Sequence, residues 1–249
     1  MDRIFKELFD IYPFNMKKAS FLLITFLFLL NCKSAVLVVS KKPEIHRADT
    51  NLNLIQIKSG SFDMGSKDSE QKRRGDEVFH NVKLEAFYFS KDPVSQKEYY
   101  AVMRNSHGSG ENINEPIDNV SWYDAVNYCN ELSIREKLTP VYMYRENTVI
   151  WNNAANGYRL LTEAEWEYAC KTDSVSFFSV SEWCWDWYGE YDLENLTNPQ
   201  GPGEGLLNQK VVRGYTDNES IKDPSARFYI NSSVRMENLG FRVARSTVK

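Results

Sequence analysis

The chain has 249 residues, of which 42% are hydrophobic and 26% charged, a balance typical of a globular protein and not of a disordered or fibrous one. Its formal net charge is -4 and no basic stripe occurs, which argues against a nucleic-acid partner. The aromatic content, with Trp 6, Tyr 14 and Phe 14, indicates a large packed core or an aromatic binding face.

The N-terminal segment predicts an export signal. Lys17 and Lys18 precede an apolar run, residues 19–30, which is about half as long as a membrane-spanning helix requires. We therefore interpret residues 1–31 as a signal peptide. Residues 1–15 carry more acidic than basic side chains, which suits the start of a signal poorly, so we interpret them as a start-site artefact.

The sequence around Cys32, LLNCKS, resembles a bacterial lipobox of the relaxed kind. On that resemblance Cys32 becomes the lipidated first residue of the mature chain, and the lipid on Cys32 makes the membrane a partner. The protein would then be an exported, membrane-anchored lipoprotein of a bacterial cell envelope. An ordinary secretory signal with a chance cysteine is the alternative. Residues 32–51 are predicted to form a tether, and residues 52–249 a single domain.

The domain is predicted to contain few helices, short strands and long loops. Strand-like segments occur at 52–57, 82–86, 141–145, 148–151, 183–187, 211–213 and 239–245. One helix is predicted at 95–104, and a clearer one starts at Ser121, where Ser121 and Asp124 have the spacing of a capping box before an apolar stripe. This mixture indicates an irregular α+β domain.

Residues 157–169, GYRLLTEAEWEYA, are predicted to pass from an extended segment into a helix. Thr162 and Glu165 have the spacing of a capping box. One aromatic edge of the helix is expected to be buried, while Glu163, Glu165 and Glu167 are expected to face solvent. Taken alone, this stretch describes a well-capped surface helix and says nothing of function.

A set of short motifs follows in a fixed order along the chain. They are MG at 64–65, DE at 76–77, HNVKL at 80–84, PV at 93–94, NVSWYDA at 119–125, YCN at 128–130, LTPVY at 138–142, GYRLLTEAEWEYA at 157–169, EWCWDWY at 182–188, VRG at 212–214 and LGFRV at 239–243. In this order they resemble the formylglycine-generating enzyme family, also called the sulfatase-modifying factor family, with Leu161 where proline is usual. The resemblance implies the family's fold, an irregular variant of the C-type lectin fold.

The departures from the family pattern bear on function. Catalytic members carry two cysteines after the arginine-glycine run, which bind copper(I) through soft thiolates and use oxygen to convert a substrate cysteine to formylglycine. Here residues 213–220 read RGYTDNES and no cysteine follows Cys184, so neither that site nor another cofactor is expected. Cys129, Cys170 and Cys184 are expected to be free thiols of the core, with a Cys170–Cys184 disulfide as the alternative.

The metal sites that the resemblance implies are also incomplete. Between Cys170 and Glu182 the chain has about eleven residues, where the family inserts several tens that help to hold calcium. Glu182 and Asp186 remain as the only candidate calcium ligands, and no metal is predicted because calcium takes about six to eight oxygens. Related iron enzymes use a histidine cluster, whereas this domain has only His80, expected to cap a strand, and His107.

The interval between the arginine-glycine run and LGFRV is the predicted contact surface. Binding proteins diversified by retroelements use this fold and vary the side chains of that interval. Aromatic and amide side chains suit an adaptable surface for an unknown protein or small ligand, and the candidates are Tyr215, Asp217, Asn218, Phe228, Tyr229 and Asn231. Ordinary loop drift after the loss of catalysis would leave similar residues, so both interpretations stay open.

The sequence favours a surface-tethered lipoprotein with a non-catalytic formylglycine-generating-enzyme-like domain that binds a ligand or a partner protein. Two alternatives remain open. One is a divergent oxidase that acts on protein cysteine, and the other is a structural component of a cell-envelope assembly.

Overall fold

The computed structural model describes the domain with short gaps. The described residues are 52–70, 73–105, 112–146, 148–172, 177–203, 205–214 and 222–247. The signal peptide, Cys32 and the tether lie outside these residues, as do His107, Tyr215, Asp217 and Asn218. No helix within the described ranges is long and apolar enough to cross a membrane.

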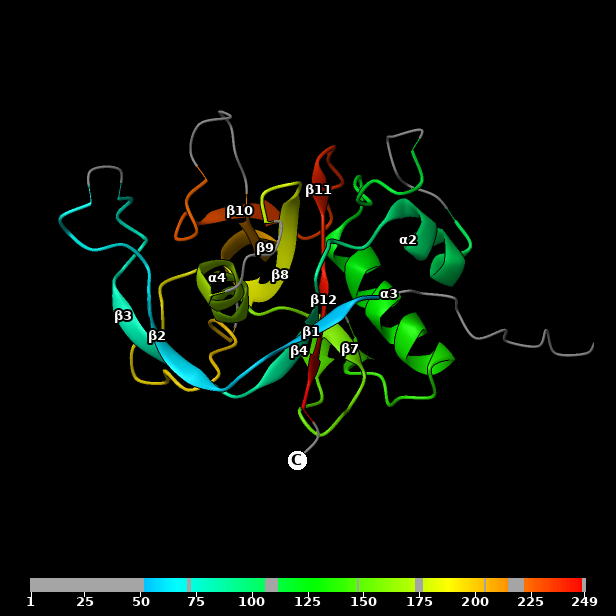
Figure 1. Cartoon of the computed structure of the whole chain (residues 1–249), viewed down its shortest axis with the longest axis horizontal. Coiled ribbons are helices and arrows are strands. Elements are labelled where there is room, and N and C mark those ends of the chain that lie inside the picture. The colour runs from blue at the N-terminus through cyan, green and yellow to red at the C-terminus, as the bar shows by residue number, and fades with distance from the viewer. Residues whose placement is uncertain are drawn as a thin grey trace, which may run out of the picture. The chain divides into compact units, whose positions relative to one another are not determined.

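The first sheet joins the two ends of the domain. Its strands, in spatial order, are β1 (Leu54–Ile57), β4 (Phe87–Ser90), β12 (Val243–Ser246) and β7 (Tyr158–Leu160). β12 pairs antiparallel with both of its neighbours, and its Ala244 lies opposite Phe89 of β4 and Arg159 of β7. Figure 1 shows β12, in red, beside β4. The last strand of the chain is therefore an interior strand of this sheet.

The second sheet contains the tryptophan-rich segment. Its strands, in spatial order, are β10 (Phe228–Asn231), β9 (Gln209–Arg213), β8 (Ser181–Trp187) and β11 (Leu239–Gly240). β11 pairs parallel with β8, whereas β10, β9 and β8 are antiparallel. β10 is an edge strand of this sheet, and one of its long sides has no strand partner among the described residues.

Two hairpins and three helices complete the described elements. The hairpins pair β2 (Gly60–Met64) with β3 (His80–Leu84) and β5 (Tyr142–Arg145) with β6 (Thr148–Trp151). The helices are α2 (Gln96–Met103), α3 (Trp122–Arg135) and α4 (Glu163–Thr172), and η1 (Leu206–Asn208) is a short 3-10 turn. Ser95 and Ser121 cap α2 and α3 in complete capping boxes, so the helix predicted from Ser121 is confirmed.

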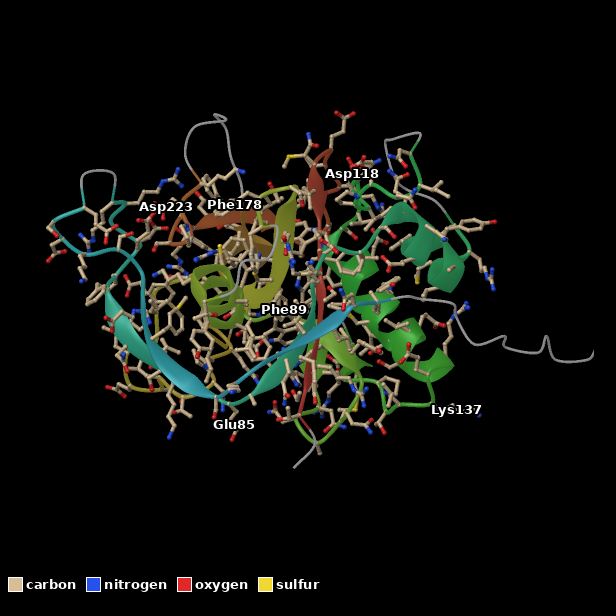
Figure 2. The ribbon with its side chains drawn as sticks, viewed as in Figure 1. Glu85, Phe89, Asp118, Lys137, Phe178 and Asp223 are labelled. Carbon is tan, nitrogen blue, oxygen red and sulfur yellow. The ribbon has the colours of Figure 1, made fainter. Side chains whose placement is uncertain are left out.

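Two hydrophobic cores occupy the domain. The α3 core includes Val126, Leu132 and Trp183, and the α4 core includes Val82, Phe89, Trp166 and Cys184. Consecutive strand residues belong to different cores, in the pairs Leu160 and Leu161, Val211 and Val212, Trp183 and Cys184, and Val243 and Ala244. Because side chains alternate across a strand, these segments form walls shared by both cores. Figure 2 shows Phe89 in the interior and Lys137 at the periphery.

The predicted fold class is confirmed. Short strands, three α-helices and long connections form an irregular α+β domain within the described residues, and the longest strand, β8, has 7 residues. The alternation predicted for 82–86 is observed in β3, where Val82 and Leu84 are buried between exposed neighbours. His80 is the first residue of β3, and its Nδ1 lies 2.7 Å from the carbonyl oxygen of Val78.

Candidate functional site

The acidic residues of α4 are buried, and the prediction that they face solvent is wrong. The exposed fractions of Glu163, Glu165 and Glu167 are 3%, 8% and 0%. The predicted capping box is confirmed. The backbone N–H of Glu165 donates to Thr162 Oγ1 at 3.2 Å, and the backbone N–H of Thr162 donates to Glu165 Oε2 at 2.9 Å. The helix start was readable from local spacing, but the burial of its carboxylates depends on distant residues.

Arginines from separate strands explain the burial of these carboxylates. Arg159 of β7 donates two bonds to Glu165, at 2.6 and 2.8 Å. Arg213 of β9 bonds Glu163 at 2.9 Å and Glu167 at 2.5 Å. These are charge-assisted bonds of favourable length, so each buried carboxylate has a cationic partner.

Arg227, just before β10, completes the network at Glu163, with bonds of 2.8 and 2.9 Å to its two carboxylate oxygens. Burial by itself would raise the pKa of Glu163, but Arg227 and Arg213 outweigh that effect, and the pKa lies below its usual value. Glu163 is therefore an anion held by two guanidinium groups.

The candidate calcium ligands Glu182 and Asp186 lie on one face of β8, toward α4. Arg242 donates to both oxygens of Glu182, at 2.6 and 2.8 Å, and the indole of Trp166 adds a third bond at 3.1 Å. Asp186 accepts a bond from Glu163 Nα at 2.7 Å. Burial and the nearby Glu163 raise the pKa of Asp186 to about 8. Within the described ranges, no group of three or more acidic, histidine or cysteine side chains is arranged to hold a metal ion.

Lys210 of β9 occupies an aromatic enclosure on the other side of the sheet. Its Nζ lies 3.6, 4.0 and 4.8 Å from the ring centroids of Trp187, Trp122 and Trp185. The same nitrogen donates to the carbonyl oxygen of Trp185 at 2.8 Å. Burial lowers the pKa of Lys210 well below its usual value, against the opposing effect of Asp186. At 1% exposure this lysine is part of the core.

The cysteines of the domain are free thiols, and the alternative Cys170–Cys184 disulfide is wrong. Cys129 and Cys184 are fully buried, whereas Cys170 is half-buried. Burial raises the pKa of the Cys170 thiol to about 12 and holds those of Cys129 and Cys184 above their usual value. Because the thiolate is the form that binds metal and reacts, all three are in environments that favour the unreactive thiol.

The described members of the predicted contact set lie on β10. Tyr229 and Asn231 are exposed, while Phe228 and Ile230, which alternate with them, pack against the α3 core. The ring of Tyr229 lies 4.3 Å from that of Tyr188, at the end of β8. Three residues, Phe228, Tyr229 and Asn231, are thus brought onto one edge strand. Their strand alternation presents two of them to solvent.

Arginine guanidinium groups lie over two aromatic rings next to β10, those of Phe228 and Tyr188. The guanidinium of Arg74 lies 4.2 Å from the Phe228 ring centroid, and that of Arg227 lies 5.0 Å from Tyr188. The hydroxyl of Tyr188 donates to Asp76 at 2.7 Å. We call Tyr188, Tyr229 and Asn231 the β10 face.

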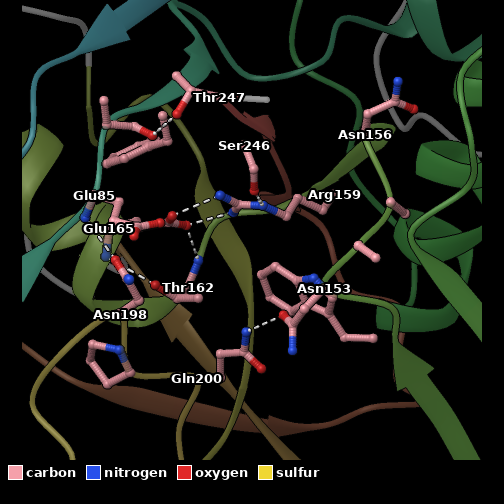
Figure 3. Close-up of a pocket in the computed structure, with 16 residues that line it drawn as sticks. Glu85, Asn153, Asn156, Arg159, Thr162, Glu165, Asn198, Gln200, Ser246 and Thr247 are labelled. Carbon is pink, nitrogen blue, oxygen red and sulfur yellow. Dashed lines mark hydrogen bonds and ion pairs between the residues drawn. The ribbon is translucent and has the colours of Figure 1, made fainter. Parts of the chain in front are cut away.

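A separate cavity of about 520 Å³ lies near the start of α4 and the end of β12. Figure 3 shows Arg159 and Glu165 pointing toward each other in it, with Asn153, Asn198 and Gln200 on nearby loops. Its polar lining consists of Glu85, Asn153, Asn156, Arg159, Thr162, Glu165, Asn198, Gln200, Ser246 and Thr247. The volume falls in the range of about 300–1,000 Å³ that is usual for ligand pockets.

Sequence reasoning did not find this cavity. Its amides come from the loop after β6 and from residues 198–200, where no periodic pattern marks them. The arginine network had a usable signal, since Arg213 and Arg242 each stand within an apolar strand-like run. A charged side chain in such a run is rarely fully buried unless it is paired.

The geometry defines a class of protein before any particular relative is considered. The two irregular sheets, the paired carboxylates of α4 and the tryptophan-rich β8 form an irregular α+β domain. Solved structures share this fold. Treponema denticola variable protein 1 matches with a TM-score of 0.65 and 24% identity over 78% of this chain and 95% of that one. PvdO from Pseudomonas aeruginosa matches with a TM-score of 0.62 and 19% identity, over 78% and 94%.

The chain belongs to the family of the sulfatase-modifying factor enzyme 1-like domain, whose profile matches residues 40–178. Among curated proteins, the chaperone protein LppX of Paenibacillus barcinonensis is 36% identical over 132 residues, which are 47% of this chain and 44% of that protein. The serine/threonine-protein kinase pkn1 of Chlamydia caviae is 24% identical over 264 residues, 84% of this chain and 40% of the kinase. This chain thus spans less than half the length of the curated relatives it matches.

Proposed function

We propose that this protein is a lipoprotein tethered to the cell surface, whose domain is non-catalytic and binds a ligand or partner protein through the β10 face. The observation that carries the proposal is the close contact between the ring of Tyr229, on the edge strand β10, and that of Tyr188, just after β8, with the ring centroids 4.3 Å apart. Tyrosine gives a large, rigid contact area that is partly polar. Asn231 beside it is held in place, because its Nδ2 donates to the carbonyl oxygen of Leu207 at 3.1 Å and its Oδ1 accepts from the backbone N–H of Ser233 at 3.0 Å.

The state of the thiols supports a binding role over an oxidase. The segment that would carry the two catalytic cysteines has none, and the three cysteines of the domain are buried or half-buried with raised pKa values. A copper(I) site needs accessible thiolates. Copper-dependent oxygen consumption on a cysteine-containing peptide would overturn the non-catalytic part of the proposal.

A photo-crosslinking experiment tests the binding surface. A crosslinking amino acid replaces Tyr229 in one version of the full chain and Tyr100 in a matched control, since these tyrosines are 49% and 54% exposed. We expect a discrete crosslinked product in intact cells from the Tyr229 position alone. Equal products from both positions, or none from Tyr229, would remove the β10 face from the proposal.

The membrane anchor is tested separately at Cys32. We expect radioactive palmitate to label the native chain and not the Cys32→Ala variant, because that thiol is the acceptor the proposal assigns. The variant should also leave the membrane fraction. Labelling that persists in the variant would show that Cys32 is not the lipidated residue, and it would leave the proposal about the β10 face untouched.

A further inference from the structure

The cavity near the start of α4 has unusually many amide side chains, and their orientation leaves hydrogen-bonding groups for a ligand. The Oδ1 atoms of Asn153, Asn156 and Asn198 accept bonds from Gln200 Nε2, Thr139 Nα and Glu85 Nα, at 2.9, 2.9 and 2.7 Å. Each bond fixes the carbonyl end of its amide.

These bonds leave the NH₂ groups of the three asparagines without acceptors among the described residues, and the Oε1 atom of Gln200 without a donor. Three NH₂ groups, each with two N–H donors, and one carbonyl oxygen therefore remain on residues that line the cavity. A ligand that carries many groups able both to donate and to accept would match them.

Trp151 adds a rigid aromatic surface to the same cavity. Its ring lies 5.2 Å from that of Trp185 and 6.1 Å from that of Tyr142, both edge to face, so its orientation is held by the α3 core. The side chain is half-buried at the cavity. The guanidinium of Arg159 lies over this ring, 4.9 Å from its centroid, so one face of Trp151 is covered. The other face of the ring, with polar groups around it, suits a ligand with C–H faces and hydroxyl edges.

The charges of the lining disfavour an anion. Arg159 is the only cation that lines the cavity within the described residues, and Glu165 already takes both of its terminal nitrogens. The carboxylates of Glu85 and Glu165 outnumber it. An anionic ligand would therefore meet no guanidinium in the lining that is left to pair with it.

We propose that this cavity binds a neutral saccharide. The fixed amides would bond its hydroxyl groups, Trp151 would contact its C–H face, and the lack of an available cation in the lining would select against acidic sugars. The cavity shares no residue with the β10 face, so this site goes beyond the function proposed above and can fail independently of it.

The test uses the purified full chain with cellobiose and N,N′-diacetylchitobiose, at up to about 10 mM, which covers dissociation constants in the millimolar range. Binding is followed by tryptophan fluorescence and by saturation-transfer NMR. We expect saturable binding of at least one of the two sugars. Cellobionic acid, the acidic counterpart of cellobiose, should bind more weakly than cellobiose.

Variants locate the binding. Asn153→Ala and Gln200→Ala should each raise the Kd about three- to tenfold, the effect of losing one hydrogen bond. Asn127→Ala is the matched control, because Asn127, like Asn153, is exposed and its Oδ1 accepts one side-chain bond. Its Kd should be unchanged. Trp151→Leu should abolish binding, and if that variant does not fold, the two amide variants decide the question.

Four results would each overturn the proposal. The first two are no saturable binding of either neutral sugar, and tighter binding of cellobionic acid than of cellobiose. The other two are an unchanged Kd in both amide variants, and a loss of sugar binding in Tyr229→Ala as large as that in the amide variants. The last result would place the sugar on the β10 face, whereas loss of the crosslink at Tyr229 with intact sugar binding would leave this proposal standing.

Discussion

Arg213 is a buried residue that forms ion pairs with two carboxylates of α4. It is fully buried, and it links β9 to α4 through Glu163 and Glu167, 50 and 46 residues away. A buried pair contributes little net stability, because desolvation opposes the attraction, but removing one partner leaves an uncompensated charge and costs about 3–5 kcal/mol. Losing one partner of these pairs should therefore destabilise the domain by more than the intact pairs stabilise it.

The raised pKa of Asp186 makes the stability of the folded domain depend on pH. Burial and Glu163 raise its folded-state pKa from 3.8 to about 8. The folded state then holds a proton that the unfolded state releases, so the contribution of Asp186 to stability is complete below pH 3.8 and is lost as the pH rises toward 8. The loss is at most about 1.4 kcal/mol per pH unit.

We predict that Asp186→Asn removes this dependence, because the amide keeps an acceptor for Glu163 Nα but does not ionise. In urea unfolding between about pH 5 and pH 8, the free energy of unfolding of Asp186→Asn should rise relative to the native chain as the pH increases. Asp192→Asn is the matched control, since Asp192 is exposed and also accepts one backbone bond. Parallel pH profiles for Asp186→Asn and the native chain would contradict the assigned pKa shift.

At the scale of elements, the features predicted correctly are those set by neighbouring residues. The capping boxes at Ser121 and Thr162 and the alternation in β3 depend on spacings of two to four residues, and all were readable. The burial of Glu163 was not, because its partner Arg227 is 64 residues away in the sequence. Local spacing identifies an element, whereas its environment depends on residues that only the fold brings near.

The β10 face and the cavity also differ in whether neighbouring or distant residues of the sequence form them. Phe228, Tyr229 and Asn231 were predicted as contact residues from their side-chain types, but the strand β10 was not predicted; its alternation presents Tyr229 and Asn231 to solvent. The cavity is assembled from loops, with Asn153 bonded to Gln200, 47 residues further along. Loop residues without periodicity give no signal in a single sequence, so only their arrangement in space shows that they form one site.

At the scale of the whole molecule, the α3 and α4 cores share two strands. β8 is a wall of both, with Trp183 facing the α3 core and Cys184 facing the α4 core. β12 is shared in the same way through Val243 and Ala244. Neither core can lose its packing without exposing one face of these two strands, so damage to either core should destabilise both.

We therefore predict that Val126→Ala in the α3 core and Val82→Ala in the α4 core have similar effects. Each valine is 0% exposed, and losing two buried methyl groups should cost about 2–3 kcal/mol and lower Tm by roughly 4–12 °C. Far-UV circular dichroism and tryptophan fluorescence should report one shared transition in both variants. Val234→Ala, at a side chain 40% exposed, should change Tm little. Two separate transitions, or a shift seen by one probe alone, would mean that the cores unfold independently despite their shared strands.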